Sequence, residues 1–438
     1  MANRHGLEPV KSPLNLRANP SVYIYISVLS FLFLSPGNLV NTPLQFIYKN
    51  QLHLVASQTA IFKLIINLPG FFAFLFGICR DRFNPLKMGD RGFILIFGSL
   101  SAFVFIALSQ VPLTVYTLGA GLILWGIALG MVGASYQAIM RNISEVRMMS
   151  GRMSTTYNLL GAGIPMLALY GGGWLAEKLD WRTLLLTIGF TYFALGLVAL
   201  WKPKVVFHGL GDYGNQTFEQ ITRDLRLLAR NRGFWIAVAM WGVWAFSPSG
   251  PTPLMYFLTD TLKMRPLQYS TFNAIFNGAA LPTIMLFGVL CKKVSLWRLL
   301  LISTVIGIPQ WLPVMFIHTP LQSYIVAALI GLGGGLASTA YYGLLFRACP
   351  ESLAGTGMLV AGSIALIVIE VGNVLGGYIY SAWGFAGCAI VTSLAYCVLL
   401  PLCFALPRSL VQPVDNEHVP TLSEIVLAEE VAQEVPLI

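Results

Sequence analysis

Two ionisable side chains stand deep inside apolar stretches of this chain. Glu370 is the only acidic residue, and Lys63 the only basic one, well within such a stretch. Charged groups in apolar surroundings are costly, and they usually face a bundle interior or a water-filled path. A buried carboxyl could carry a proton, and a buried ammonium could meet an anionic solute or that carboxyl. The rival interpretations are a static ion pair, or a Lys63 that snorkels while Glu370 lies in an unrelated cavity.

Asparagine side chains extend the polar surface that the two charged residues begin. Asn67 and Asn373 lie about one helical turn from them, and we place both on the cytoplasmic side of the pair. Asn273 and Asn277 occupy the repeat-related positions of the eighth apolar run. By helical rise, the charged residues lie about 10 and 16 Å below the outer ends of their runs. We therefore predict a continuous polar face in the outer half of the molecule.

A tandem repeat organises the segments that hold these residues. Residues 42–58 align without a gap with residues 252–268, an offset of 210, and Tyr136 aligns with Tyr342 at an offset of 206. Such self-similarity indicates two related halves within the 438 residues. In a membrane, paired halves are how a central site is built that opens alternately to either side.

The composition places the chain in a membrane, because 56% of its residues are hydrophobic and only 10% are charged. A helix needs about 20 apolar residues to cross a hydrocarbon core of about 30 Å. Twelve runs meet this need: 22–46, 56–79, 92–109, 113–140, 157–175, 184–201, 234–258, 269–290, 296–317, 321–346, 353–381 and 385–406. The predicted fold class is an all-α membrane protein with twelve transmembrane helices in two pseudo-symmetric six-helix bundles.

These runs divide the chain into five regions. We expect a cytoplasmic N-terminal segment at 1–20, bundles at 21–201 and 233–407, a cytoplasmic linker with an amphipathic helix at 202–232, and an acidic cytoplasmic tail at 408–438. The predicted inner segments hold 21 Lys and Arg residues and the outer segments hold 5, so both termini are expected in the cytoplasm. Topology thus explains the net charge of +9, and we expect a plasma (inner) membrane protein with no nucleic-acid partner.

No residue pattern suits catalysis, a metal or a cofactor. The six cysteines show no C-x-x-C spacing, and the five histidines are scattered over termini and loops. The sequence has no G-x-S-x-G, H-E-x-x-H or Walker-type element. We therefore predict that the protein is not an enzyme and holds neither cofactor nor metal.

The loop after the second predicted span carries a recognisable pattern. Residues 77–82 read Gly-Ile-Cys-Arg-Asp-Arg, and Gly89 and Arg91 follow after six intervening residues. Together with the two six-span halves, this pattern resembles the major facilitator superfamily, whose loop signature is G-x-x-x-D-R followed by glycine and basic residues. The longer loop is similar to that of the folate and biopterin transporter branch and of PucC-type proteins.

The resemblance implies roles for the residues of this loop. Gly77 would allow close helix packing, while Asp81 and Arg82, with Gly89 and Arg91 beyond them, would belong to a charge latch. Such a latch fastens the cytoplasmic ends of the halves when the carrier faces outward. The rival interpretation is simple anchoring of basic residues on the inner side. The equivalent second-half loop, 288–298, has lost the acid, so any latch is asymmetric.

The resemblance also implies that spans one, four, seven and ten surround a cavity. These spans offer amides and aromatic rings at Asn41, Gln45, Gln137, Trp241, Tyr256 and Tyr341. Such groups with one cation suit an organic molecule bearing a ring or a carboxylate better than a bare inorganic ion. Each ring could instead serve packing or an interfacial belt.

We predict a monomeric secondary transporter that moves a small organic solute by alternating access. Proton symport, antiport and facilitated diffusion all stay open, because residues 121–133 lack the arginine that many proton-coupled members carry in span four. The alternative is a non-transporting membrane assembly or pigment-handling factor of the PucC type on the same scaffold.

Overall fold

The computed structural model describes residues 20–146, 150–207, 226, 229–291, 293–348, 354–406 and 411, and this described part is helical. Three predicted regions lie wholly or largely outside it, namely the N-terminal segment, the amphipathic helix of the linker and the acidic tail. The described elements belong to the two predicted bundles and to the start of the linker.

The first half consists of long helices connected by short turns. Its elements are α1 (Pro20–Phe46), the π-helix η2 (Ile47–Gln51), α2 (Ala56–Ile66), α3 (Leu68–Phe71), α4 (Ala73–Arg82), the 3-10 helix η3 (Pro85–Lys87), α5 (Asp90–Gln110), α6 (Val115–Val146), α7 (Ser150–Lys178), α8 (Trp181–Val198) and α9 (Lys204–Phe207). Its core lies where α5 packs on α6 and α8, with the rings of Phe105 and Tyr192 stacked 5.6 Å apart.

The second half also consists of helices connected by short turns. They are α11 (Arg232–Ala245), α12 (Pro251–Tyr256), the π-helix η4 (Phe257–Thr261), α13 (Pro266–Leu290), α14 (Leu296–Gly307), the 3-10 helix η5 (Leu312–Phe316), α15 (Pro320–Ala348), α16 (Ala354–Cys397) and α17 (Leu399–Ala405). Buried apolar side chains of α11, α14, α15 and α16 form most of its core.

Nine helices of the described part are long and apolar enough to cross a membrane. Two predicted spans are divided instead: the second becomes α2, α3 and α4, and the seventh becomes α11 and α12. The last two predicted spans are joined in α16, whose helical course changes at Gly384 with φ 67°, a conformation that glycine adopts without strain. The multi-pass α-helical architecture is confirmed, while the number twelve stays a prediction.

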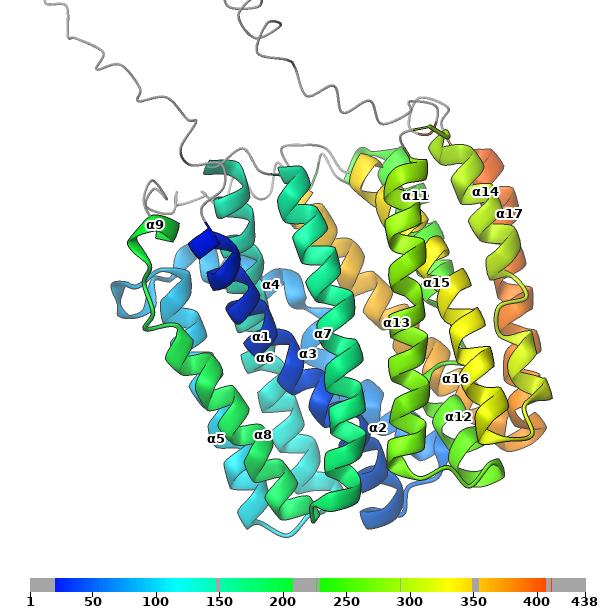
Figure 1. The fold of residues 1–438 in the computed structure, drawn as a ribbon, viewed down its shortest axis with the longest axis horizontal. Helices are drawn as coiled ribbons and strands as arrows, with labels where there is room; N and C mark the ends of the chain where they lie inside the picture. The colour runs from blue at the N-terminus through cyan, green and yellow to red at the C-terminus, as the bar shows by residue number, and fades with distance from the viewer. Residues whose placement is uncertain are drawn as a thin grey trace, which may run out of the picture.

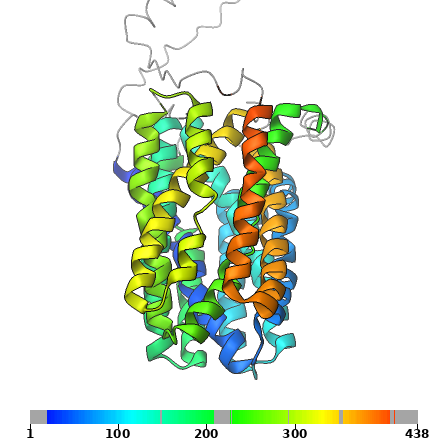
Figure 2. The same cartoon turned by 90° about the vertical axis from the view of Figure 1, so that its right-hand side faces the viewer.

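The two halves stand side by side and meet along two helix pairs (Figure 1). At the front of Figure 1, α7 of the first half packs against α13 of the second, and the other pair is α2 to α4 against α16. In the second pair Gly377 faces Ser57 and Gly77 faces Leu359, so the paired helices are antiparallel. Seen from the side, the helices of the second half run in nearly the same direction (Figure 2).

The repeat predicted at an offset of 210 residues is reproduced in the backbone. The π-helices η2 and η4 begin at residues 47 and 257, and each is followed by a non-glycine residue of positive φ, His53 at 52° and Lys263 at 53°. A glutamine then accepts a hydrogen bond from the backbone N–H before each next helix, Gln58 from Val55 and Gln268 from Arg265. The left-handed conformation costs about 1 kcal/mol for such residues, so its repetition marks a shared turn.

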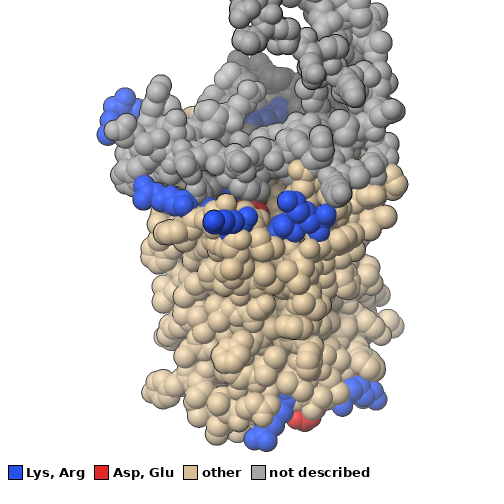
Figure 3. Space-filling view, turned by 90° about the vertical axis from the view of Figure 1, so that its left-hand side faces the viewer, with Lys and Arg blue, Asp and Glu red and all other residues tan. Residues whose placement is uncertain are grey.

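Charged side chains gather at the two ends of the molecule, and the wide belt between them is free of them on the face that Figure 3 shows. We call the end that holds η2 and η4 the Lys49 face, and the end that holds η3 and the start of α5 the Arg80 face. The belt between the two faces matches a hydrocarbon layer, because charged groups avoid such depth. The protein is therefore a multi-pass membrane protein.

Candidate functional site

Glu370 lies on α16 where this helix meets the first half. The residue is only 5% exposed. Its Oε1 accepts a hydrogen bond of 2.7 Å from Nδ2 of Asn67, the residue that ends α2. Its Oε2 is buried and accepts no hydrogen bond within 3.5 Å, although the Asn373 side chain is near enough to interact with the carboxyl. The Glu370 carboxyl of the second half thus accepts a hydrogen bond from the Asn67 amide of the first half, 303 residues away in sequence. This bond involves only one of the two carboxyl oxygens.

Lys63 lies one helical turn before Asn67 on α2 and is half-buried. Its ammonium interacts electrostatically with Glu370, but no ion pair within 4 Å joins the two groups among the described contacts. The structure therefore brings the two charged residues into one region without a direct contact.

The predicted asparagines have different partners. Asn373 is buried, and its Oδ1 accepts a hydrogen bond of 3.3 Å from the backbone N–H of Thr252 at the start of α12. Because α2 and α16 are antiparallel, Asn373 lies toward the Lys49 face and Asn67 toward the Arg80 face. The prediction that both lie on the same side of the charged pair is wrong. Asn273 and Asn277 donate to carbonyls of their own helix, at 3.2 and 2.8 Å.

Two amides of α1 connect with the second half. Gln45 donates a hydrogen bond of 2.9 Å to Oδ1 of Asn41 and accepts one of 3.4 Å from the hydroxyl of Tyr269 on α13. Gln45 is buried and Asn41 is exposed. The exposed amide of Asn41 is therefore connected to the second half through the buried amide of Gln45.

The remaining predicted cavity residues do not join this group through any described contact. Tyr341 is fully buried in the core of the second half, where its hydroxyl bonds to Thr304 at 2.6 Å. Trp241 packs edge-on against Tyr342 with ring centroids 5.5 Å apart. Gln137 is exposed on α6. Tyr341 thus serves packing, while Gln137 and Trp241 keep accessible surface.

Lys49 forms a contact between the halves that the sequence analysis missed. It lies on η2, and its ammonium donates to Thr259 Oγ1 at 2.6 Å and pairs with Asp260, both on η4. We call these three residues the Lys49 clamp. The gapless repeat aligns Lys49 with Thr259, and this alignment was the signal that could have revealed the contact.

Tyr256 completes the contact at this face. Its ring lies 5.2 Å below the Lys49 ammonium, and its hydroxyl bonds to Thr59 Oγ1 at 2.8 Å and to the carbonyl of Leu54. Of the predicted cavity residues, Tyr256 is therefore part of the closure between the halves at the Lys49 face.

Glycines bring the halves close together near the same face. A Cβ at Gly377 would lie 2.9 Å from Ser57 Cα and 3.3 Å from Ala60, and a Cβ at Gly173 would lie 1.7 Å from Ser270 Oγ. Ala60 and Ser270 are again 210 residues apart. The two helix pairs thus make equivalent close contacts, which need a residue without a side chain.

The loop between α4 and α5 holds an ion pair within the first half. Arg80 binds Asp90 through two hydrogen bonds, Nε to Oδ1 at 2.7 Å and Nη2 to Oδ2 at 3.1 Å. Arg91 donates to the carbonyl of Ala199 at 3.2 Å and lies over the ring of Phe207. The two contacts of Arg91 connect the start of α5 with the end of α8 and with α9.

The other residues predicted for the charge latch have different environments. Gly89 has φ 60° and its N–H donates to Asn84, so it forms the turn into α5. A Cβ at Gly77 would lie 3.2 Å from Leu359 of α16, which makes Gly77 a point of contact between the halves. Arg82 is exposed, and the side chain of Asp81 lies outside the described part.

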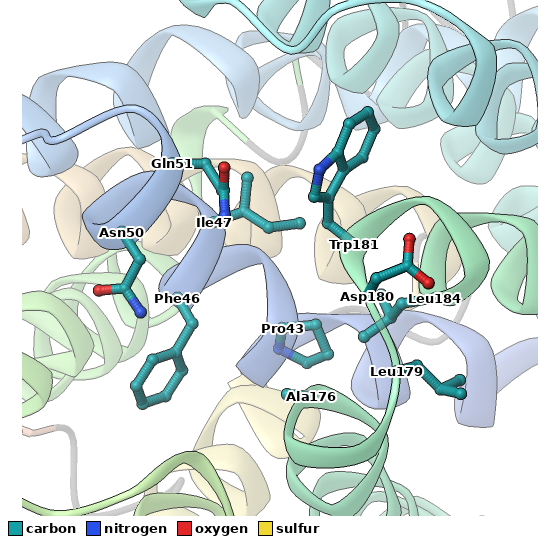
Figure 4. A pocket seen from close by; sticks show the side chains of 10 residues that line it. All are labelled: Pro43, Phe46, Ile47, Asn50, Gln51, Ala176, Leu179, Asp180, Trp181 and Leu184. Carbon is teal, nitrogen blue, oxygen red and sulfur yellow. The ribbon is translucent and has the colours of Figure 1, made fainter.

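A pocket of about 250 Å³ opens at the Lys49 face within the first half (Figure 4). Asn50, Gln51 and Asp180 are its polar residues, and Trp181 forms part of its wall. Asp180 caps α8 by accepting from the hydroxyl of Thr183 at 2.6 Å, and these bonds hold the pKa of its carboxyl below the usual range. The pocket contains none of the predicted site residues.

A comparison of the sequence with models of known protein families identifies the family of this chain. The family model of the Major Facilitator Superfamily matches residues 150–369, just over half of the chain. The chain belongs to the major facilitator superfamily. The family predicted from the loop pattern and the two halves is thus confirmed.

Relatives and solved structures agree with this membership. Folate transporter 2 of Plasmodium falciparum (isolate 3D7) is 20% identical over 310 residues, and the match covers 68% of this chain and 65% of that protein's length. The nucleoside transporter NupG has the same fold with a TM-score of 0.64 at 13% identity, covering 88% of this chain and 98% of that one. A bacterial homolog of the human lysosomal transporter Spinster, inward-facing and unoccupied, gives 0.67 at 14% identity over 92% and 98% of the two chains.

Proposed function

We propose that this superfamily member is a secondary transporter, which moves a small organic solute across the membrane by rocking one half against the other. The single observation that carries the proposal is the Glu370 site. It places one acidic side chain at the contact between two halves related by an internal repeat, which is where transporters of this kind hold substrate and coupling ions. Membership in the superfamily and the transporters among its relatives support the proposal.

We propose that Glu370 couples transport to protons, and the geometry of its carboxyl supports this role. An ionised carboxylate with an unpartnered oxygen is costly in a buried site, whereas a proton removes the charge. The Asn67 amide bonds to this carboxyl across the two halves, so a change of charge on Glu370 alters the free energy of their contact. Proton uptake and release would thus be coupled to the movement of the halves.

Lys63 is proposed to attract the solute. Its ammonium is half-buried near Glu370 without a described ion pair, so it can bind an anionic group that enters between the halves. An organic molecule with a carboxylate and a ring system fits this cation together with the amides of Asn41 and Gln45. The folate transporter among the relatives makes a folate-like pterin the first substrate to test. Gln137 and Trp241 stay predictions as further cavity residues.

Orientation follows from the distribution of basic residues. With 21 Lys and Arg residues on one predicted side and 5 on the other, we propose that the Arg80 face is cytoplasmic and that the Lys49 face is outside the cell. The Lys49 clamp and the glycine contacts near it join the proposed outer ends of the two halves in this conformation. We propose a plasma (inner) membrane protein that works as a monomer.

Uptake into proteoliposomes tests the proposal. We expect radiolabelled folate, or another member of a panel of carboxylate-bearing ring compounds, to accumulate when a pH gradient is applied, and Glu370→Gln to abolish that accumulation. Glu177→Gln is the matched control, because this exposed glutamate accepts a backbone hydrogen bond from Leu267 that a glutamine oxygen can also accept.

The outcomes separate the alternatives. No uptake of any compound by the wild-type protein would favour the non-transporting factor of the PucC type. Uptake whose gradient dependence survives Glu370→Gln would remove the proton role and leave the transporter proposal standing.

A further inference from the structure

An apolar groove of about 530 Å³ lies in the second half, between α11 and the two arms of α16. One face of α11 lines it with Trp235, Val238, Ala239, Gly242, Val243 and Phe246. These positions recur every three or four residues, so they form a single stripe along the helix. The other wall comes from Ile364 and Val368 on one arm of α16, from Ala395 on the other arm, and from Val398 directly after this helix.

The groove opens onto the belt of the molecule. Val398, directly after α16, is 50% exposed and continues a row of exposed apolar side chains that Ile390 and Leu394 form on the second arm of this helix. Trp235, at the end of the groove near the Arg80 face, is 40% exposed. Lipid chains therefore have direct access to the groove.

The length of the groove matches one lipid leaflet. Trp235 and Phe246 are eleven residues apart on α11, which corresponds to about 16 Å along the helix axis. One leaflet of a hydrocarbon core of about 30 Å is about 15 Å deep. The groove thus begins at the Arg80 face and ends near the middle of the belt.

Cationic side chains stand at the open end. Arg232 precedes Trp235 by three residues, and both are exposed on the same side of the helix start. Arg230 is also exposed and lies beside Ala229, whose carbonyl accepts a hydrogen bond of 3.1 Å from the Trp235 indole. No described ion pair neutralises either arginine. A tryptophan with a hydrogen-bonded indole and nearby arginines is typical of the lipid headgroup level.

We propose that this groove binds one anionic phospholipid, whose acyl chain lies along the α11 stripe and whose headgroup phosphate meets Arg230 and Arg232. The inference is independent of the transported solute, because none of these residues belongs to the Glu370 site. An apolar chain fills a groove that has almost no polar lining, and the paired arginines supply the charge complementarity.

Native mass spectrometry of the full-length protein with equimolar dioleoyl phosphatidylglycerol and dioleoyl phosphatidylcholine tests the proposal. We expect phosphatidylglycerol adducts to dominate. Arg230→Gln and Arg232→Gln should each reduce them about fivefold. Ala239→Leu and Gly242→Leu should reduce the binding of both lipids, because a leucine there fills the groove. A Cβ at Gly242 would lie 3.9 Å from Val368 Cγ2, an ordinary van der Waals contact, so the first added carbon meets no obstacle.

Two control variants mark the site. Arg265→Gln removes an exposed arginine from the opposite face, and Ala386→Leu enlarges an exposed alanine of α16 outside the groove. Neither should change lipid binding. Equal binding of the two lipids by the wild-type protein, or unchanged binding in both groove-filling variants, would overturn the proposal.

Discussion

Lys49 donates a hydrogen bond of 2.6 Å to Thr259, the residue that occupies its own position in the second repeat. The contact joins the π-helices η2 and η4, which follow the first long helix and the short helix α12 in their respective halves. Asp260, next to Thr259, supplies the negative charge. The two halves therefore meet at this face through equivalent segments that carry different side chains.

The first prediction concerns this clamp. Lys49→Gln should shift the equilibrium toward opening at the Lys49 face by about 1.4-fold to fivefold, because partly exposed ion pairs contribute about 0.2–1 kcal/mol. Electron–electron distance measurements between spin labels at the exposed positions Gln51 and Thr261 would report the opening. Lys178→Gln at the same face should have no effect. An unchanged distance distribution in Lys49→Gln would show that the clamp does not hold the halves together.

The second prediction concerns the hydrogen bond between Asn67 and Glu370. Asn67→Leu should lower the free energy of unfolding by about 1.5–3 kcal/mol, since hydrogen bonds to charged groups contribute that much. Asn277→Leu is the control, because its amide bonds only within its own helix in the described contacts. In a Glu370→Leu background the effect of Asn67→Leu should shrink. Equal effects in both backgrounds, measured by thermal unfolding in detergent, would contradict a direct interaction.

The third prediction concerns the glycines between the halves. Gly377→Ala and Gly173→Ala should destabilise the closed Lys49 face by about 1–3 kcal/mol, because the added carbon overlaps the facing helix. Gly288→Ala, at a helical glycine where a Cβ meets nothing within 4 Å, should be neutral or stabilising. The spin-label distances described above are the measurement. Equal behaviour of Gly377→Ala and Gly288→Ala would mean that the halves do not approach as closely as described.

The fourth prediction concerns Arg80 and Asp90. Asp90→Asn should cost about 3–5 kcal/mol, since it removes the negative charge of the buried carboxylate to which Arg80 donates two hydrogen bonds. The exchange Arg80→Asp with Asp90→Arg should recover part of the loss. Thermal unfolding of the single and double variants measures the coupling energy. Additive losses in the double variant would show that the pair does not act as a unit.

The fifth prediction concerns the cap of α8. The pKa of Asp180 is lowered by its bond from the Thr183 hydroxyl, so the ionised cap stabilises the folded protein above the pKa of an unfolded aspartate. That contribution is lost as the pH falls through the lowered folded pKa. Asp180→Asn keeps a capping oxygen but should abolish this acid-dependent part of the Tm. Parallel pH profiles for the wild type and Asp180→Asn would contradict the assignment.

The sequence predicted the duplicated helical halves and the family, because both depend on patterns that survive along the chain. The offset of 210 residues correctly located two turns that share their π-helix and their residue of positive φ. Partners across helices were harder to predict. The prediction that Asn373 and Asn67 lie on the same side of the charged pair is wrong, because α16 is antiparallel to α2. The hydrogen-bond donor to Asn373 is the backbone N–H of Thr252. This N–H is available because the seventh predicted span is interrupted before α12, which places it in the first turn of a helix.

Tyr341 illustrates a second limit. In a membrane helix both the buried and the lipid-facing sides are apolar, so periodicity does not tell which side an aromatic ring occupies. Tyr341 and Tyr342 are neighbours in sequence, yet the first is enclosed with Thr304 and the second meets Trp241. The Arg80 and Asp90 pair escaped prediction for another reason, because its members are ten positions apart on two helices whose connection includes irregular turns.

The meeting of equivalent segments has a consequence for how the two copies diverged. A residue that touches its own counterpart lies near the pseudo-twofold axis, as at the centre of a symmetric dimer. Identical lysines there would place two positive charges face to face. Lysine in the first half and threonine followed by aspartate in the second half relieve that repulsion. With these residues in place, each half pairs better with the other half than with a second copy of itself.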